Sequence, residues 1–266
     1  MYKRQGLGIE EARIKGRFVV DMLHFYKRLT QSKLSSYKLK DIVKEENLGI
    51  DYDYIPKNFK KEWQETPEKI IDYNKKDVES IVKLEEVVKP IGFHKALADF
   101  IGCEIDETDY NSKIIDFYLL KKAKEKGIVL PTKKQGEKSS YKGAVVLDPV
   151  KGLHKNVLVF DFASLYPNIM LSFNLSPETK NKEGIKVNGI SWSKDRGFIP
   201  SIISELFSYR YAIKKERDKY EPGSRDYELY DNKQTAVKFI INSLYGYFGF
   251  SEGTFNKIFI QAAWTK

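Results

Sequence analysis

Apolar residues recur at helical spacing in the last third of the chain. Four of them fall three or four positions apart: Val237, Ile241, Leu244 and Phe248. This spacing is typical of a helix that packs along one face. We expect one helix over about residues 200–220 and a second over about 226–247, with Pro-Gly-Ser at 222–224 between them. Two long helices joined by a tight turn predict an antiparallel helical hairpin.

A different pattern, a short continuous apolar run, occupies residues 157–160. Its sequence, VLVF, is too short and too β-branched for a helix and predicts a buried strand that ends at Asp161. Strands and turns are expected before it, over 141–149, whereas the polar stretches 132–140 and 176–197 predict an exposed connector and a loop or small ribbon. A strand that delivers a carboxylate to its exposed end is a common way to hold a divalent cation against phosphate.

The N-terminal region begins with an α/β pattern. GRFVVD (16–21) predicts a strand, and residues 22–29 predict the helix that follows it. The stretch 47–59 is rich in Asp, Tyr and Asn and predicts a loop.

Two further helices are expected between this loop and the middle of the chain. The first covers 67–88, because its first residue is a proline, Thr66 can act as its N-cap, and Pro90 follows its end. The second covers 112–126 and is ended by Gly127.

Composition narrows the class of protein. With 266 residues, 41% of them hydrophobic, the chain can build more than one core. It has no apolar run of eighteen residues and no N-terminal signal pattern, so we expect no membrane association and a cytoplasmic location. The single cysteine, Cys103, excludes an internal disulfide. The three histidines lie far apart, which argues against a zinc site and against catalysis by histidine.

The charge balance is basic, with 46 Lys and Arg against 37 Asp and Glu, a net charge of +9. Together with 17 Tyr and 16 Phe, this balance favours a nucleic-acid partner, because cations neutralise phosphates and aromatic rings stack on bases. A lysine-rich solvated surface gives the same balance. Charge alone leaves both interpretations open.

The helical hairpin carries a pattern of polar residues beside its apolar stripe. Each helix has three such residues at i, i+4 and i+7: Arg210, Lys214 and Arg217 on the first, and Lys238, Asn242 and Tyr245 on the second. Two facing stripes of this kind can clamp a polyanion the size of a nucleoside triphosphate. A solvated charged face is the alternative for the first stripe.

Two runs of sequence resemble a known family. DFASLYPNIM (161–170) and KFIINSLYGYFGF (238–250) resemble motifs A and B of the family B DNA polymerases, in the family's order and at its separation. The resemblance implies that Asp161 binds two catalytic magnesium ions and that the carbonyl of Phe162 adds a ligand. It also implies that Asp161 and Lys238 are the catalytic residues of this chain.

The resemblance further implies a pocket for the incoming nucleotide. Leu165 and Tyr166 match the sugar pocket, in which the Tyr166 ring is the steric gate that excludes a ribose 2′-hydroxyl. The cations that hold the triphosphate are Arg210, Lys214 and Lys238, and the surface against the nascent base pair is Asn242, Tyr245 and Gly246. Asn168 stands where serine is commoner in the family.

A loop before motif A also resembles the family. Tyr141, Gly143 and Ala144 resemble its Tyr-x-Gly-Gly loop, which contacts the template strand and links synthesis to proofreading. Ala144 replaces the second glycine, so a positive φ there would be strained.

An exonuclease motif is implied further upstream. Tyr73 and Asp77 match the third motif of the family's 3′–5′ exonuclease domain, and their i, i+4 spacing puts both on one helix face. Tyr-x-x-x-Asp is a weak pattern alone; its place ahead of the polymerase motifs strengthens it.

The implied fold class is α+β (mixed), with a partial RNase H-like exonuclease region, a partial palm with an antiparallel sheet, and a two-helix fingers hairpin. The expected domains are the C-terminal part of the exonuclease-like domain (1–95), linker helices and N-terminal palm with motif A (96–199), the fingers with motif B (200–247), and a return into the palm (248–266).

The resemblance also implies missing parts. Two-metal phosphoryl transfer needs two ions about 3.5–4 Å apart, and Asp161 alone cannot hold both. Motif C, the thumb and the first exonuclease motifs are absent, and the acidic runs 50–54 and 106–110 lie before motif A in polar surroundings. We interpret Asp21 as structural. We expect partner subunits to supply the missing parts and complete the magnesium site, as in a naturally split polymerase; a chain cut from a longer polymerase is the alternative.

The expected function is therefore that of one subunit of a split DNA-directed DNA polymerase, which acts on primer-template DNA and dNTPs. A non-catalytic DNA-binding or scaffold subunit derived from a polymerase is the alternative. A free-standing nuclease has too few carboxylates.

Overall fold

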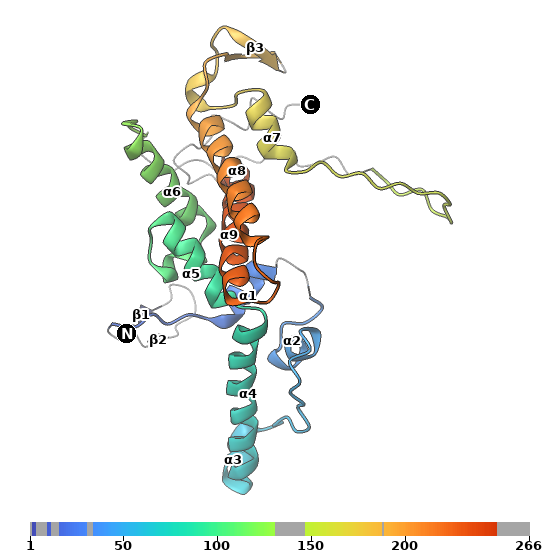
Figure 1. Ribbon diagram of the computed structural model, residues 1–266. Coiled ribbons are helices and arrows are strands. Elements are labelled where there is room, and N and C mark those ends of the chain that lie inside the picture. The colour runs from blue at the N-terminus through green and yellow to red at the C-terminus, as the bar shows by residue number, and fades with distance from the viewer. Residues whose placement is uncertain are drawn as a thin grey trace. The chain divides into compact units, whose positions relative to one another are not determined.

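The computed structural model describes residues 2–3, 10–11, 16–30, 34–130, 147–187 and 189–248 (Figure 1). The chain divides into two compact units. Residues 1–100 and 104–109 form the first unit, and residues 101–103 and 110–266 form the second. In the described ranges, no helix is long and apolar enough to cross a membrane.

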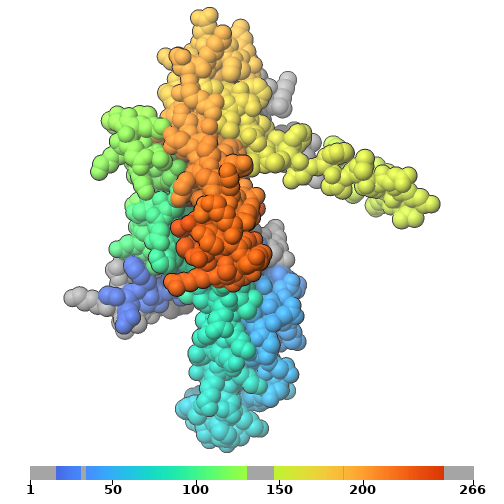
Figure 2. Space-filling model, viewed as in Figure 1, coloured from blue at the N-terminus to red at the C-terminus, as the bar shows by residue number. Residues whose placement is uncertain are grey.

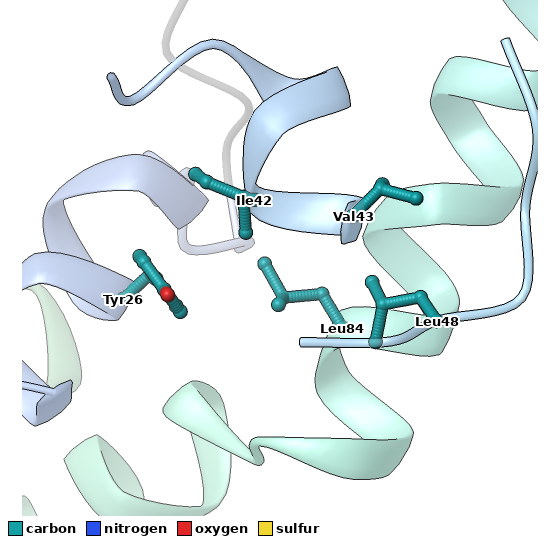
Figure 3. Packing of buried hydrophobic residues seen from close by; sticks show 5 residues of the cluster. All are labelled: Tyr26, Ile42, Val43, Leu48 and Leu84. Carbon is teal, nitrogen blue, oxygen red and sulfur yellow. The ribbon is translucent and has the colours of Figure 1, made fainter. Parts of the chain in front are cut away.

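The first unit is mainly helical. Its elements are the antiparallel pair β1 (Tyr2–Lys3) and β2 (Glu10–Glu11), helices α1 (Met22–Thr30), α2 (Leu39–Glu45), α3 (Phe59–Glu65), α4 (Pro67–Val87) and α5 (Pro90–Ile101), and the 3₁₀ turn η1 (Ile105–Asp109). Figure 3 shows part of its core, where side chains from α1, α2 and α4 converge with one from the loop after α2. The residues are Tyr26, Ile42, Val43, Leu48 and Leu84.

Local signals explain where α1 and α4 begin. The Asp21 side chain accepts a hydrogen bond from the Leu23 amide at 2.9 Å, which caps α1. Pro67 is the first residue of α4, as the sequence predicts, and Thr66 occupies the N-cap position without a side-chain capping bond. The predicted helices at 22–29 and 67–88 are therefore confirmed.

The strand predicted at 16–21 is wrong. These residues form a turn and irregular backbone, and Phe18 and Val19 are 55% and 60% exposed. An apolar run becomes a strand only where a neighbouring strand pairs with it, and no described residue pairs with this one. Sequence reasoning also missed α2, α3 and α5.

A buried histidine lies at the centre of the first unit. His94 is fully buried, stacks on Phe25 at 3.6 Å between ring centroids, and bonds Thr108 Oγ1 through Nδ1 at 2.6 Å. The Arg28 guanidinium donates to the carbonyls of Thr108 and Asp109. Burial, and then the positive charge of Arg28, lower the pKa of His94 to about 3.

The second unit contains the helical hairpin. Its elements are α6 (Asn111–Glu125), α7 (Leu165–Ser172), the 3₁₀ turn η2 (Pro177–Thr179), the antiparallel pair β3 (Gly184–Val187) and β4 (Ile190–Ser193), α8 (Phe198–Arg217) and α9 (Arg225–Phe248). Helices α8 and α9 lie side by side, with α6 and α7 packed against them (Figure 1). The predicted hairpin, the small ribbon within 176–197 and the helix at 112–126 are confirmed.

An apolar seam joins α8 to α9. Both helices contribute fully or nearly fully buried aliphatic side chains: Ile199, Ile202, Ile203 and Leu206 from α8, and Val237, Ile240, Ile241 and Leu244 from α9. Burying a side chain of this kind contributes about 1.5–3 kcal/mol. The turn between the helices includes Gly223, which adopts φ +85°.

The start of α8 is capped by residues about twenty positions earlier in the chain. A Glu178 carboxylate oxygen accepts from the Phe198 amide at 2.5 Å, and the Ser176 hydroxyl oxygen accepts from the Ile199 amide at 3.2 Å. Asn174 Oδ1 accepts from the Gly197 amide at 2.9 Å. These bonds satisfy amides that a helix leaves without partners, and the carboxylate is favourable beside the positive end of the helix dipole.

The buried strand predicted at 157–160 is also wrong. The segment is extended but belongs to no described sheet, and Val159 and Phe160 are both 88% exposed. In the face that Figure 2 shows, no other element covers this yellow-green segment. Its apolar side chains would be buried only against strands that the described residues do not include. Of the strands and turns predicted over 141–149, only residues 147–149 are described, and they form no strand; residues 132–140 and 141–146 lie outside the described ranges.

We expect Gly197→Ala to destabilise the second unit by about 1–3 kcal/mol. A Cβ at this position would lie 2.6 Å from Ser176 Cβ and 2.8 Å from Thr179 Cγ2, so the cap of α8 would have to shift. Urea unfolding followed by circular dichroism measures the change. Gly246→Ala is the matched control, because no atom lies within 4 Å of its added Cβ. Equal stability of Gly197→Ala and wild type would contradict the prediction.

We expect acid to destabilise the protein partly through His94. Between pH 6.5 and about 3 the unfolded chain binds a proton that the folded histidine does not, so the free energy of unfolding falls as pH falls. The slope from this one group is at most about 1.4 kcal/mol per pH unit. His94→Gln should remove this component from urea unfolding curves recorded across the window, whereas His154→Gln, at an exposed histidine, should keep it. Identical slopes for wild type and His94→Gln would count against this account.

Candidate functional site

Two tyrosines far apart in the sequence stack face to face. Tyr166 of α7 and Tyr245 of α9 have ring centroids 4.1 Å apart and an interplanar angle of 2°. Both residues are half-buried, so part of each remains accessible to solvent. This stack brings the DFASLYPNIM run and the KFIINSLYGYFGF run together.

A tight turn leads from Asp161 into α7. Ser164 adopts the left-handed conformation, φ 50°, just before the helix begins. Asn168 holds the turn from inside the helix, because its side-chain amide donates to the Ala163 carbonyl at 2.8 Å. The asparagine at this position therefore has a local structural role.

Possible ligands for a cation lie at the end of the extended segment. Asp161 and Phe162 are both exposed, and so is Leu165 at the first position of α7. The Asp161 carboxylate and the Phe162 carbonyl are oxygen donors of the kind that Mg²⁺ prefers. Within the ranges that the structure describes, no three acidic, histidine or cysteine side chains come together as a metal site.

Helix α9 presents one polar stripe toward solvent. Lys238, Asn242 and Gly246 are exposed on it at successive i, i+4 positions, and Tyr245 lies half-buried beside them. The missing side chain at Gly246 leaves the helix backbone open to close approach from outside.

The cations of α8 do not share one environment. Lys214 is exposed. Arg210 is half-buried, and its guanidinium donates to Gln234 Oε1 on α9 from Nη2 at 3.0 Å and from Nε at 3.3 Å. Burial lowers the pKa of Arg210, and the charge of Arg217 lowers it further.

Arg217 is instead paired with acids. Its guanidinium donates to Asp218 and Asp231, with closest distances of 2.7 Å to each, and lies over the Tyr227 ring. These carboxylates raise the pKa of Arg217. Of the three cations that the sequence predicts on one face of α8, Arg217 thus bonds across the hairpin to Asp231. Sequence reasoning missed Gln234 and Asp231, although both lie on α9 within two turns before Lys238.

Helix α6 is held against both helices of the hairpin. The Tyr247 hydroxyl on α9 donates to the buried Asp116 carboxylate. Lys122 and Lys126 contact Glu205 on α8 at 3.4 Å and 2.7 Å. These contacts fix the end of the hairpin that carries Tyr245.

The predicted upstream pair, Tyr73 and Asp77, lies in the first unit. Both side chains of α4 contact Tyr52: its hydroxyl donates to Asp77 Oδ1 at 2.8 Å, and its ring meets Tyr73 edge to face at 5.8 Å. Burial raises the pKa of Tyr73, and the charge of Asp77 adds to the effect. The pair is thus engaged with the loop that precedes α3. The predicted loop residues Tyr141, Gly143 and Ala144 lie outside the described ranges.

Comparisons with known proteins agree with the motifs. The family model for DNA polymerase family B matches residues 107–265. The chain is 32% identical to a DNA polymerase of Archaeoglobus fulgidus over 248 residues, covering 90% of this chain and 31% of that protein. It is 30% identical to DNA polymerase 2 of Aeropyrum pernix, covering 89% of this chain and 31% of that protein.

A solved structure is also similar. The family B DNA polymerase of the hyperthermophilic archaeon Pyrobaculum calidifontis superimposes with a TM-score of 0.70 at 28% identity. The match covers 87% of this chain and 33% of the solved chain. The chain thus spans about a third of the length of the curated relatives named above.

Proposed function

Because this chain belongs to DNA polymerase family B, we propose that it contributes motif A and the fingers to template-directed transfer of nucleotides from dNTPs to a primer 3′-end. The stack of Tyr166 on Tyr245 carries the proposal, since it joins motif A to motif B beside the exposed stripe of α9. A nucleotide seated there lies within reach of residues from both motifs.

The cations of the hairpin hold the triphosphate in this proposal. Lys214 and Lys238 are exposed. Lys214 lies one turn after Arg210 on α8, and Lys238 lies one turn after Gln234, the α9 residue to which Arg210 donates. Arginine grips phosphate oxygens through two N–H groups, and lysine acts as a point charge. Lys238 stabilises the charge that develops on the leaving pyrophosphate.

The aromatic pair and its neighbours orient the rest of the nucleotide. Tyr166 lies under the sugar and excludes a 2′-hydroxyl, and Leu165 lines the same pocket. Asn242, Tyr245 and Gly246 face the nascent base pair, where the absent side chain of Gly246 allows close approach.

Asp161 and the Phe162 carbonyl would hold magnesium in the active enzyme. When bound, a pair of such ions neutralises charge on the reacting phosphate and activates the primer 3′-oxygen. One carboxylate is insufficient for two ions, so we propose that the motif C aspartate comes from a partner chain, together with the thumb. The apolar residues 157–160 beside this carboxylate are exposed in the described part of the chain, and an apolar run of this kind is stabilised when another segment covers it.

In the same proposal the first unit is the end of an exonuclease domain. Tyr73 and Asp77 are its third motif, and partner chains supply the other carboxylates. The loop with Tyr141, Gly143 and Ala144 contacts the template strand. These assignments follow the family resemblance at these positions.

Primer extension tests the catalytic assignment. The chain is assayed alone and with the missing polymerase parts added back, on primer-template DNA with dNTPs and Mg²⁺. In the complete mixture, Asp161→Ala should lower the extension rate by about 10²–10³-fold or more, because a metal ligand is lost.

Asp148→Ala is the matched control, since it removes an exposed carboxylate from the same extended segment. If Asp161→Ala extends primers as fast as wild type, the chain is a non-catalytic DNA-binding subunit and the proposal fails.

Sugar selectivity tests the role of Tyr166. Tyr166→Ala should admit ribonucleotides, measured as the ratio of kcat/KM for a dNTP to that for the matching NTP, because the ring that excludes the 2′-hydroxyl is gone. Tyr166→Phe keeps the ring and should keep the ratio. Tyr211→Ala, at an exposed tyrosine of α8, is the control. Unchanged selectivity in Tyr166→Ala would refute the gate assignment.

A further inference from the structure

Gln234 links the two helices of the hairpin from a buried position. Its side chain is only 8% exposed and lies between Arg210 of α8 and Asp231 of its own helix. Its Oε1 accepts two hydrogen bonds from the Arg210 guanidinium, at 3.0 and 3.3 Å. Its Nε2 donates to Asp231 Oδ1 at 3.1 Å and to Thr235 Oγ1 at 2.8 Å.

The neighbours of this amide fix its orientation. Arg210 can only donate hydrogen bonds, so it must face the amide oxygen, and the Asp231 carboxylate can only accept, so it must face the amide nitrogen. Asp231 Oδ1 also accepts from Arg217 at 2.7 Å, which holds the carboxylate in place. The position of Arg210 is thus determined by a chain of bonds that ends at a second arginine.

Arg210 and Arg217 are held by different kinds of hydrogen-bond acceptor. Arg217 donates to two carboxylates, Asp218 and Asp231, which compensate its charge. In the bonds to Gln234, Arg210 meets a neutral oxygen that orders the guanidinium without cancelling its charge. Arg210 is also partly desolvated, which strengthens its interaction with any anion that reaches it.

We propose that Gln234 is a positioning residue: it holds the Arg210 guanidinium ordered through a neutral acceptor and not through a directly bonded carboxylate, ready for a phosphate of the incoming nucleoside triphosphate. The inference rests on the proposed function. Its physical basis is preorganisation, because a long side chain ordered before binding loses less conformational entropy when the ligand arrives.

Binding of dTTP and of inorganic tripolyphosphate to the full-length chain, measured by isothermal titration calorimetry, tests this role. Gln234→Met keeps the side-chain length but removes the acceptor, and it should weaken binding of both probes by about three- to tenfold. In an Arg210→Ala background the same substitution should have no further effect, because Gln234 acts through Arg210. Asn232→Met removes an amide elsewhere on α9 and should bind as wild type does.

Gln234→Glu distinguishes a residue that positions Arg210 for an anion from one that only stabilises the packing of α8 on α9. The variant is made in an Asp231→Asn background, where the second glutamate oxygen meets an amide donor. A glutamate still accepts hydrogen bonds from Arg210 but neutralises its charge, so the proposal expects triphosphate binding weaker than that of Asp231→Asn alone. A purely structural brace then expects the affinity of Asp231→Asn alone. Thermal melting of each variant, recorded in parallel, shows that the protein compared is folded.

The outcomes separate this inference from the proposed function. If wild type binds neither probe, or if Arg210→Ala binds as tightly as wild type, the assigned triphosphate site is wrong and the inference fails with it. If Arg210→Ala weakens binding but Gln234→Met does not, the inference alone is overturned. The inference is also overturned if the effects of the two substitutions multiply, or if Gln234→Glu in the Asp231→Asn background binds as Asp231→Asn alone does.

Discussion

The apolar seam between α8 and α9 is the constraint on which the rest of the second unit depends. Aliphatic side chains from both helices fill it, and their packing fixes how the polar side chains of α8 face those of α9. The seam sets the separation at which Arg210 reaches Gln234 and Arg217 reaches Asp231. Because the seam buries the apolar face of α9, the polar stripe with Lys238, Asn242 and Gly246 is exposed to solvent.

Hydrogen bonds at the start of α8 connect the hairpin to the segment that follows motif A. Glu178 and Ser176 bind the first amides of α8, and they lie a few residues after α7 in the chain. The helix that carries Tyr166 is thereby coupled to the helix that carries Arg210. The stack of Tyr166 on Tyr245 adds a contact on the side of α9. Three helices thus meet at one end of the unit, and the proposed nucleotide pocket lies where they meet.

Sequence reasoning succeeded where a signal is local. The helices at 67–88 and 112–126 and both helices of the hairpin have caps, breakers or long periodic stripes, and the structure confirms them. It failed at 157–160, where four apolar residues predict a strand, because a strand forms only beside a pairing strand and no described residue pairs with this run. It treated Arg210 and Arg217 alike, because the acids that distinguish them come together only when α8 packs on α9. The polymerase family could be identified from the sequence because motifs A and B are long runs of characteristic residues in the family's order. Gln234 could not be identified, because its bond to Arg210 forms only when α8 packs on α9.

The exposed segment that leads to Asp161 has a consequence for how this polypeptide behaves in solution. Val157, Leu158, Val159 and Phe160 are consecutive, exposed and outside every described sheet, so backbone N–H and C=O groups along them can pair with a like segment of another copy. Such a stretch is a template for aggregation as well as for correct docking. Self-association through this segment therefore rises with protein concentration, and dilute conditions favour recovery of the dispersed chain.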